Sequence, residues 1–318
     1  MLLAPESCDR RDVVRERAVI QEKPAVGHAS PYQLALKLAC NHAGKTILQH
    51  RYMAYPLSIS PIFRLEANGA VAASQRAYLY RMNTSPGLLA DDAIGVSLQL
   101  AAGSQLYLAD QSAMKVHTMP QTDTQATLTY DIELAAEATL EFLPEPLILF
   151  ADAALTQTTE ITLHPTAGLS WGEIILPGRL ARGEVYAFRH YRNRMRVKSP
   201  AQKLWFVESM NLLGKDNRFA ATDLFAGRSG RSVLGTLVLV LPEAIASASN
   251  LSQLEAEIET LAEQTAGAVA LASSTLPGDR GLFVRAISST TRELHACFKA
   301  ALNCVRRLRN QAQLPYSL

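Results

Sequence analysis

VSLQLAAGSQLYL (residues 96–108), YDIELAAEATLEFL (130–143) and EITLHPTAGLSW (160–171) share one pattern. In each segment an alternating apolar and polar run ends on a leucine, five mostly small or polar residues follow, and another leucine opens a second run; the leucine pairs are Leu100/Leu106, Leu134/Leu140 and Leu163/Leu169. Such alternation is typical of half-buried strands, and repetition about every 30 residues is typical of stacked supersecondary units. The repeats predict a solenoid-like stack of strands, with coincidence among ordinary hairpins as the alternative.

The alternating pattern continues on both sides of the repeats. Leu34, Leu36 and Leu38 alternate with smaller or polar residues, and no convincing helical face occurs between residues 32 and 241. We therefore predict a mainly β, layered body of short strands and hairpins over residues 31–245. Residues 1–30 read as a polar, loosely ordered lead-in, and residues 31–318 as one domain.

The C-terminal part, residues 246–318, has helical periodicity instead. A first helix is predicted with Asn250 and Gln253 as its N-terminal cap pair and with the apolar face Leu251, Leu254, Ile258 and Leu261. A second helix is predicted to start near Thr290, where Thr290 and Glu293 form a capping-box pattern. Its apolar face comprises Leu294, Cys297, Phe298, Ala301, Val305 and Leu308. The stretches 268–273 and 282–287 between the helices read as two more strands.

Composition and charge restrict the class of protein. The chain has 318 residues, 48% of them hydrophobic, and 31 basic against 29 acidic side chains, for a formal net charge of +2. This hydrophobic content can fill a core, and the small charge argues against a nucleic-acid partner. With no apolar run of membrane-spanning length and no signal-peptide pattern, we expect no membrane partner and a cytoplasmic location. Four cysteines without a CxxC pair are then expected to be reduced thiols.

Motifs for catalysis or for tight metal binding are incomplete. AGKT at 43–46 resembles the end of a phosphate-binding loop, but Ala39 stands where that loop needs a glycine and no helical pattern follows. We read Asn41 to Gly44 as a hairpin turn. The seven histidines are isolated in sequence, and no GxSxG elbow occurs. We therefore predict that the protein is not an enzyme and holds no tightly bound cofactor.

A basic row is predicted on one strand near residue 190. Arg192, Arg194, Arg196 and Lys198 alternate along the chain, so they share one face of a strand. A solvated strand face is the simpler interpretation. The alternative is an interface for an acidic partner surface, where charge would set orientation and association rate.

Five blocks in order along the chain carry a more specific signal: GKTILQHRYMAYPLSISP at 44–61, SPGLLADD at 85–92, ADQSAMKVH at 109–117, LEFLPEPLILFADA at 140–153 and LSWGEIILPGRLARGEVYAF at 169–188. Together they resemble the urease accessory protein family UreD, called UreH in some bacteria. The matching positions are Asp92, Gln111, Lys115, Pro144, Trp171, Gly178, Arg179 and Gly183. The resemblance runs from about residue 34 to the end of the chain.

The chain departs from the family pattern at three places. Ala90 and Asp91 stand where glycines are usual, Ala109 and Asp110 replace a pair of threonines, and His117 replaces a tyrosine. These changes affect the expected loop geometry rather than the resemblance.

The resemblance implies a non-enzymatic chaperone for urease. Members of the family bind the urease apoprotein and join UreF and the GTPase UreG in a complex that delivers nickel. Nickel is proposed to pass through UreD by an internal tunnel, and the family fold is a layered β structure with C-terminal helices. Weak, scattered oxygen ligands suit transit, because a conduit must release its ion.

Asp152, Glu173 and Glu184 are our candidates for oxygen ligands along a nickel route, since each lies in a block that carries the resemblance. The alternative is that these carboxylates accept backbone hydrogen bonds and hold turns. Gly178 and Gly183 are expected to be turn residues that position Arg179 and Glu184. A rival interpretation of the whole chain is a glycan-acting β-solenoid enzyme, which would need a carboxylate pair and exposed indoles, for which only Trp171 and Trp205 are available.

Overall fold

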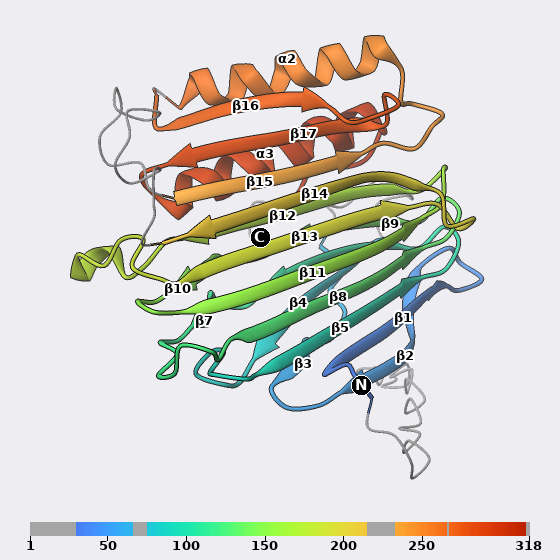
Figure 1. Cartoon of the computed structure of the whole chain (residues 1–318). Helices are drawn as coiled ribbons and strands as arrows, with labels where there is room; N and C mark the ends of the chain where they lie inside the picture. Colours follow the sequence, from blue (N-terminus) through green and yellow to red (C-terminus); the bar gives the residue numbers. More distant parts are fainter. Residues whose placement is uncertain (1–29, 66–74, 215–232, 266, 316–318) are drawn as a thin grey trace, which may run out of the picture.

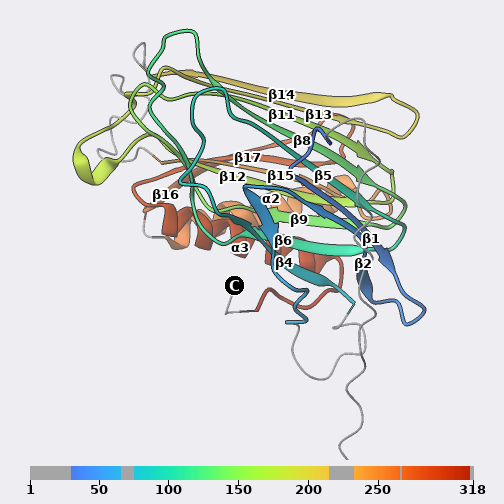
Figure 2. The same ribbon diagram turned by 90° about the horizontal axis from the view of Figure 1, so that it is seen from below.

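Two β-sheets lie face to face, and two helices cover the outer side of one of them (Figures 1 and 2). The computed structural model describes residues 30–65, 75–214, 233–265 and 267–315. The predicted mainly β, layered fold with two C-terminal helices is confirmed. Most of the lead-in, residues 1–29, lies outside the described residues.

The first sheet, sheet A, has seven strands in the order β14 (Leu204–Leu213), β13 (His190–Lys198), β11 (Ala154–Leu163), β8 (Ala126–Leu134), β5 (Ala93–Leu100), β1 (Leu34–Cys40) and β2 (Thr46–Met53). The second, sheet B, contains β16 (Val269–Thr275), β17 (Gly281–Ser288), β15 (Val233–Val240), β12 (Gly168–Leu176), β9 (Thr139–Leu143), β6 (Gln105–Asp110), β4 (Ala77–Asn83) and β3 (Leu57–Ile59). Two short strands extend sheet B, because β10 (Leu147–Leu149) pairs with both β12 and β7 (Met114–Val116).

The sequence repeats form the stacked part of the two sheets. β5, β8 and β11 pair in parallel in sheet A, while β6, β9 and β12, which follow them in the chain, pair in parallel in sheet B. The aligned leucines lie directly opposite one another: Leu100, Leu134 and Leu163 in sheet A, and Leu106, Leu140 and Leu169 in sheet B. The chain therefore crosses from one sheet to the other at the same place in each repeat, as the solenoid prediction required.

Two apolar cores result from this arrangement. The larger one fills the space between the sheets, and the smaller one lies between sheet B and the helices. Strand β8 shows how the pattern works, since its residues alternate between buried and exposed along its length. Its exposed side chains lie on the outer face of sheet A, which no helix covers in the described ranges (Figure 2).

The helices are α2 (Ala248–Gln264) and α3 (Thr291–Leu308). The predicted cap of α3 is confirmed, because Thr290 Oγ1 accepts a hydrogen bond from the Glu293 N–H at 3.2 Å. The predicted cap of α2 is wrong: Ser247 caps this helix by accepting from the Asn250 N–H, so Asn250 lies in the first turn. Ala248, Ser249 and Asn250 precede the first large apolar residue, Leu251, so apolar periodicity placed the start of the helix too late.

Helix α3 is fixed to sheet B by buried charges. Arg306 of α3 binds both carboxylate oxygens of Glu141 on β9, with the shortest contact, from Nη2 to Oε2, at 2.5 Å. Arg76 Nη1 lies 3.2 Å from the same Oε2, and Arg306 also donates to the hydroxyl of Tyr78. Burial alone would raise the pKa of Glu141, but Arg76 and Arg306 outweigh burial and hold the pKa below its usual value.

The turn expected at residues 41–44 is confirmed, because β1 and β2 form an antiparallel pair across it. The side chain of Asn41 accepts hydrogen bonds from the N–H groups of Ala43 and Lys45. Strand β2 follows this turn, rather than the helix that a phosphate-binding loop needs. No helix in the described part of the chain has both the length and the apolar composition needed to cross a membrane.

Candidate functional site

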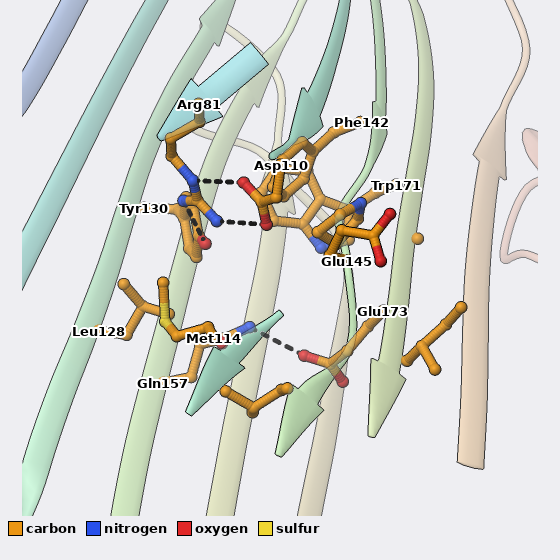
Figure 3. Close-up of a pocket in the computed structure, with 14 residues that line it drawn as sticks. Arg81, Asp110, Met114, Leu128, Tyr130, Phe142, Glu145, Gln157, Trp171 and Glu173 are labelled. Atoms are coloured by element: carbon orange, nitrogen blue, oxygen red, sulfur yellow. Dashed lines mark hydrogen bonds and ion pairs between the residues drawn. The ribbon is translucent and has the colours of Figure 1, made fainter. Parts of the chain in front are cut away.

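A small polar cavity of about 30 Å³ lies inside the otherwise apolar space between the sheets (Figure 3). Its lining comprises Arg81, Asp110, Met114, Leu128, Tyr130, Phe142, Pro144, Glu145, Leu147, Gln157, Trp171, Gly172, Glu173 and Ile174. This volume is enough for one water molecule or one small ion. Because six of these residues are charged or polar, the cavity is the clearest candidate for a functional site in the described chain.

One side of the cavity is a closed ion pair. Arg81 on β4 donates from Nε and Nη2 to the two carboxylate oxygens of Asp110 on β6, at 2.7 and 2.9 Å (Figure 3). Arg81 Nη1 also donates to the hydroxyl of Tyr130 at 2.7 Å. All three side chains are buried, so the two charges compensate each other in a fixed bidentate geometry. Asp110, one of the departures from the family pattern, therefore has a structural reason in this chain.

Glu173 of β12 lies at the inner end of the cavity and has a different environment. Its Oε1 accepts hydrogen bonds from Gln157 Nε2 at 2.9 Å, Tyr191 Oη at 2.5 Å and Asn193 Nδ2 at 3.1 Å. Oε2 accepts only from Asn193 Nδ2, at 3.2 Å, among the bonds of the described residues. Burial raises the pKa of Glu173, and these neutral donors offset only part of that effect. Among the described residues no cation forms a hydrogen bond with this buried carboxyl group, and Arg285 lowers its pKa only through longer-range attraction.

A second cavity, of about 10 Å³, lies on the other side of Glu173. Trp171 and Glu173 line both cavities, and Glu208 and Met210 of the edge strand β14 line the second one. Glu208 forms an ion pair with Arg285 of β17, which joins the two sheets at this side. The two cavities and Glu173 therefore form a row of polar positions through the space between the sheets.

The family-like blocks come together at one end of the stacked strands. The Leu88 N–H donates to the Lys115 carbonyl, and the Phe150 N–H donates to the Val116 carbonyl. The Ala151 N–H in turn donates to Glu184 Oε1 at 2.7 Å. Residues from four separate blocks are thus joined by hydrogen bonds at the end where β7 and β10 lie, and we call this set of contacts, from Leu88 to Glu184, the motif ladder (Figure 1).

Glu184 and Arg179 hold the last part of this ladder. Arg179 Nε donates to Glu184 Oε2 at 2.5 Å, and the guanidinium lies 4.5 Å from the centre of the Phe150 ring. The hydrogen bond from Arg179 lowers the pKa of Glu184. Glu184 also accepts backbone N–H bonds from Ala151 and Arg179, which an arginine at position 184 could not accept. A double variant that exchanges the two residues, Arg179→Glu with Glu184→Arg, therefore cannot reproduce these contacts.

Gly178 and Gly183 flank a short 3₁₀ turn, η2 (Leu180–Arg182), with φ of 145° and 72°. Both angles lie in the region that favours glycine, as expected of turn residues. A Cβ on Gly178 would lie 2.1 Å from the Glu184 carbonyl oxygen, whereas Gly183 faces open space. This is also the one helical turn in the described residues between 32 and 241.

The three candidate nickel ligands are not brought together. Glu173 lies between the sheets, Glu184 lies in the motif ladder, and Asp152 is a half-buried turn residue with φ of 56° near Glu184. The Asp152 N–H donates to Ala187, and its carbonyl accepts from Arg189 Nε. Within the described residues no three His, Cys, Asp or Glu side chains converge in a way that could hold a metal.

The other family-like positions fall into three environments. Trp171 is buried and Pro144 half-buried, and both line the first cavity, while Gln111 and Lys115 are exposed. Asp92 closes the turn after residue 88 by accepting from the Leu89 N–H at 2.7 Å. In that turn Asp91 has φ of 65°, so it takes up the left-handed geometry for which glycine is favoured.

The basic row of β13 lies on the outer face of sheet A. Arg192 and Arg194 are exposed, and Arg196 Nη1 lies 3.4 Å from Glu160 Oε1. The other face of β13 points between the sheets and carries Tyr191 and Asn193, two of the three donors to Glu173. Sequence reasoning missed these donors, although residues that alternate with a solvated basic row must point inward.

Comparison with known proteins agrees with the family resemblance inferred from the sequence motifs. A family model described as the UreD urease accessory protein matches residues 31–317. The urease accessory protein UreD of Trichodesmium erythraeum (strain IMS101) is 46% identical over 287 residues, which cover 90% of this chain and 99% of that protein. The UreD protein of Lysinibacillus sphaericus (strain C3-41) is 31% identical over 79% of this chain and 87% of its own length. The chain therefore belongs to the UreD urease accessory protein family.

Proposed function

We propose that this protein is a non-catalytic scaffold for urease maturation that lets Ni²⁺ pass through its interior as cargo. In this proposal it binds apo-urease together with UreF and the GTPase UreG in the cytoplasm. Membership of the family supports the role in urease maturation. The named partners and the nickel route go beyond what family membership supports. The environment of Glu173 is the observation that supports the route.

Glu173 has the properties expected of a transit position. An ionised carboxylate that is buried without a cation is costly, and a passing divalent ion would supply the missing charge. Oε1 already accepts three hydrogen bonds, which leaves Oε2 as the oxygen available to an ion. One carboxylate with neutral neighbours binds weakly, so it can also release the ion.

The two cavities that Glu173 lines support a path through this part of the protein. The first, at about 30 Å³, has room for an ion or a water molecule, while the second, at about 10 Å³, is at the lower limit. Met195 and Met210 line the second cavity, and methionine side chains can adopt several rotamers at little cost. We infer that the ion moves past Glu173 when these side chains rotate.

Glu173→Gln tests the route, since it keeps the shape and removes the charge. We expect this variant to assemble with UreF, UreG and apo-urease as the wild type does, but to activate urease poorly at limiting nickel and nearly normally at saturating nickel. Glu160→Gln, which removes a carboxylate from the outer face of sheet A, is the matched control. Normal activation by Glu173→Gln at limiting nickel would contradict the route.

Asp152 and Glu184 have weaker claims to the route than Glu173. Both lie in the motif ladder, where Glu184 binds Arg179 and two backbone N–H groups. We therefore propose that Glu184 shapes this end of the molecule, and that Asp152 is a secondary candidate for nickel. In Asp152→Asn, normal assembly with poor activation at limiting nickel would support the secondary role.

The glycan-acting alternative gains no support from the site. Trp171 is only 2% exposed, so a sugar ring cannot stack on its indole, and Trp205 is covered by the guanidinium of Arg280 at 4.4 Å from the ring centre. We therefore keep the scaffold as the proposed function.

A further inference from the structure

His295 and Glu145 form an unusual pair at the outer end of the first cavity. His295 is on α3, and Glu145 lies between β9 and β10, flanked by Pro144 and Pro146. His295 Nε2 lies 3.7 Å from Glu145 Oε2. Two ligands that each lie about 2.1 Å from one cation are at most about 4.2 Å apart, so this separation allows both atoms to bind the same ion.

The imidazole nitrogen of this pair is not satisfied by the protein. His295 Nε2 is buried and makes no hydrogen bond with the described residues. A buried nitrogen without a partner is costly, and such groups call for a ligand or a role. A ring nitrogen that is held beside a carboxylate oxygen and lacks a hydrogen bond is a geometry in which histidine can bind a metal ion.

The surroundings of the pair connect it with both solvent and the cavity. The Glu145 side chain is 42% exposed, whereas that of His295 is 15% exposed. Glu145 also lines the cavity whose inner end is Glu173 (Figure 3). Among the described residues, Asp110, Tyr80 and Lys299 interact electrostatically with Glu145, and Lys299 is the cation of these three. Arg81 lines the same cavity but is paired with Asp110. The pair therefore marks the place where the interior polar row reaches the surface.

We propose that His295 Nε2 and Glu145 Oε2 are a two-ligand entry site for a borderline divalent cation, completed by water. A mixed nitrogen and oxygen pair suits Ni²⁺, Co²⁺ or Zn²⁺ better than Mg²⁺ or Ca²⁺. The identification of the cation as nickel rests on the proposed function. Two protein ligands hold an ion loosely, and the ion can then move inward to Glu173.

The test is direct metal binding by the full chain without an affinity tag, co-purified with UreF if that is needed for solubility. Titration with Ni²⁺, followed by calorimetry, should give a site that His295→Gln and Glu145→Gln each weaken by at least about tenfold, since even outer-shell changes have that effect. Lys299→Met should tighten binding, because it removes the competing positive charge. His164→Gln is the matched control, since His164 is half-buried and bonded locally to Thr166.

Each outcome separates this site from the proposed function. Unchanged Ni²⁺ affinity in both His295→Gln and Glu145→Gln, with normal thermal unfolding, would overturn the entry site. That result would leave the Glu173 route to be decided by urease activation. Conversely, if these variants lose Ni²⁺ while Glu173→Gln activates urease normally, the entry site stands and the interior route fails. A loss equal to that of His164→Gln would identify non-specific histidine binding and also overturn the site.

Discussion

Glu141 and Glu173 lie on the neighbouring strands β9 and β12 of the same sheet, and both are buried, yet their environments are opposite. Glu141 points toward the helices and contacts the guanidinium groups of Arg76 and Arg306. Glu173 points between the sheets and contacts only neutral donors. The pKa of Glu141 is lowered and that of Glu173 is raised as a result.

The difference separates a structural carboxylate from a candidate functional one. A buried charge that is fully paired contributes to specificity of the fold. Its removal leaves the buried partner charges uncompensated, which lowers the stability of the fold. A buried carboxyl group without a paired charge is retained at a cost to stability, which suggests a use for it. Removing the charge from each carboxylate in turn tests this distinction.

Glu141→Gln should have the largest effect. It leaves two buried guanidinium groups without their counter-charge, and we expect a loss of about 3–5 kcal/mol in the free energy of unfolding. Because the pKa of Glu141 is below its unfolded value of about 4.3, the stabilisation is present above that pH and disappears as the pH falls through the folded pKa. Urea unfolding at pH 7 and at several pH values below about 4 checks both points. Equal stability of variant and wild type at pH 7 would contradict the pairing argument.

Asp110→Asn should come next. It breaks the bidentate contact with Arg81, and a buried hydrogen bond to a charged group is worth about 1.5–3 kcal/mol. One buried guanidinium loses its counter-charge here, against two in Glu141→Gln, so the loss should be smaller than that of Glu141→Gln. Denaturant midpoints measured side by side will establish the order, and a reversed order would mean that Arg76 and Arg306 find other acceptors when the charge of Glu141 is removed.

Glu184→Gln should have a smaller effect than either. Its partner Arg179 is 38% exposed, so solvent screens the ion pair, and glutamine can still accept the Ala151 N–H. Hydrogen exchange at Ala151 is the sensitive measurement. Gly178→Ala in the same ladder should speed that exchange far more, because its Cβ would collide with the backbone of residue 184. Gly183→Ala should have a smaller effect, because its φ of 72° strains an alanine but its Cβ meets no atom within 4 Å.

Glu173→Gln should change stability least, or raise it. The folded pKa of Glu173 is above the unfolded value, so ionisation destabilises the fold once the pH exceeds the unfolded pKa of about 4.3. The variant should therefore match the wild type near pH 4 and become equal or more stable as the pH rises to 8. A clear loss of stability at pH 8 would show that the charge of Glu173 is paired after all.

The sequence predicted what depends on local periodicity. The leucine spacing indicated the sheet register that the structure has, and the Thr290–Glu293 pattern located α3. It nominated Glu173 but not the other polar positions between the sheets, although one signal was available. Arg81, Gln157 and Glu173 each occupy the inward-facing phase of a strand, next to apolar residues such as Leu79, Leu155 and Trp171. A polar residue in that phase indicates a buried group, but its partner comes from another strand and cannot be read from spacing.

The partners of Glu141 show the same limit over a longer range. Arg306 is 165 residues away from Glu141 in the chain. Its position also lies outside the apolar face that the sequence predicts for the second C-terminal helix. Only the packing of α3 on sheet B brings the two side chains together. For the same reason the pair of His295 and Glu145 could not be found from sequence, where the histidines are isolated.

The long separation between Glu141 and Arg306 also affects how the chain is made. At about 5–20 residues per second, a ribosome needs many seconds to synthesise the segment between β9 and α3. During that time the stacked strands can form, but the helix-facing side of sheet B stays uncovered and Glu141 lacks its main counter-charge. Completion of the fold therefore waits for the C-terminal helix. A nascent chain with such a face is prone to aggregate, and a partner present during translation would shield it.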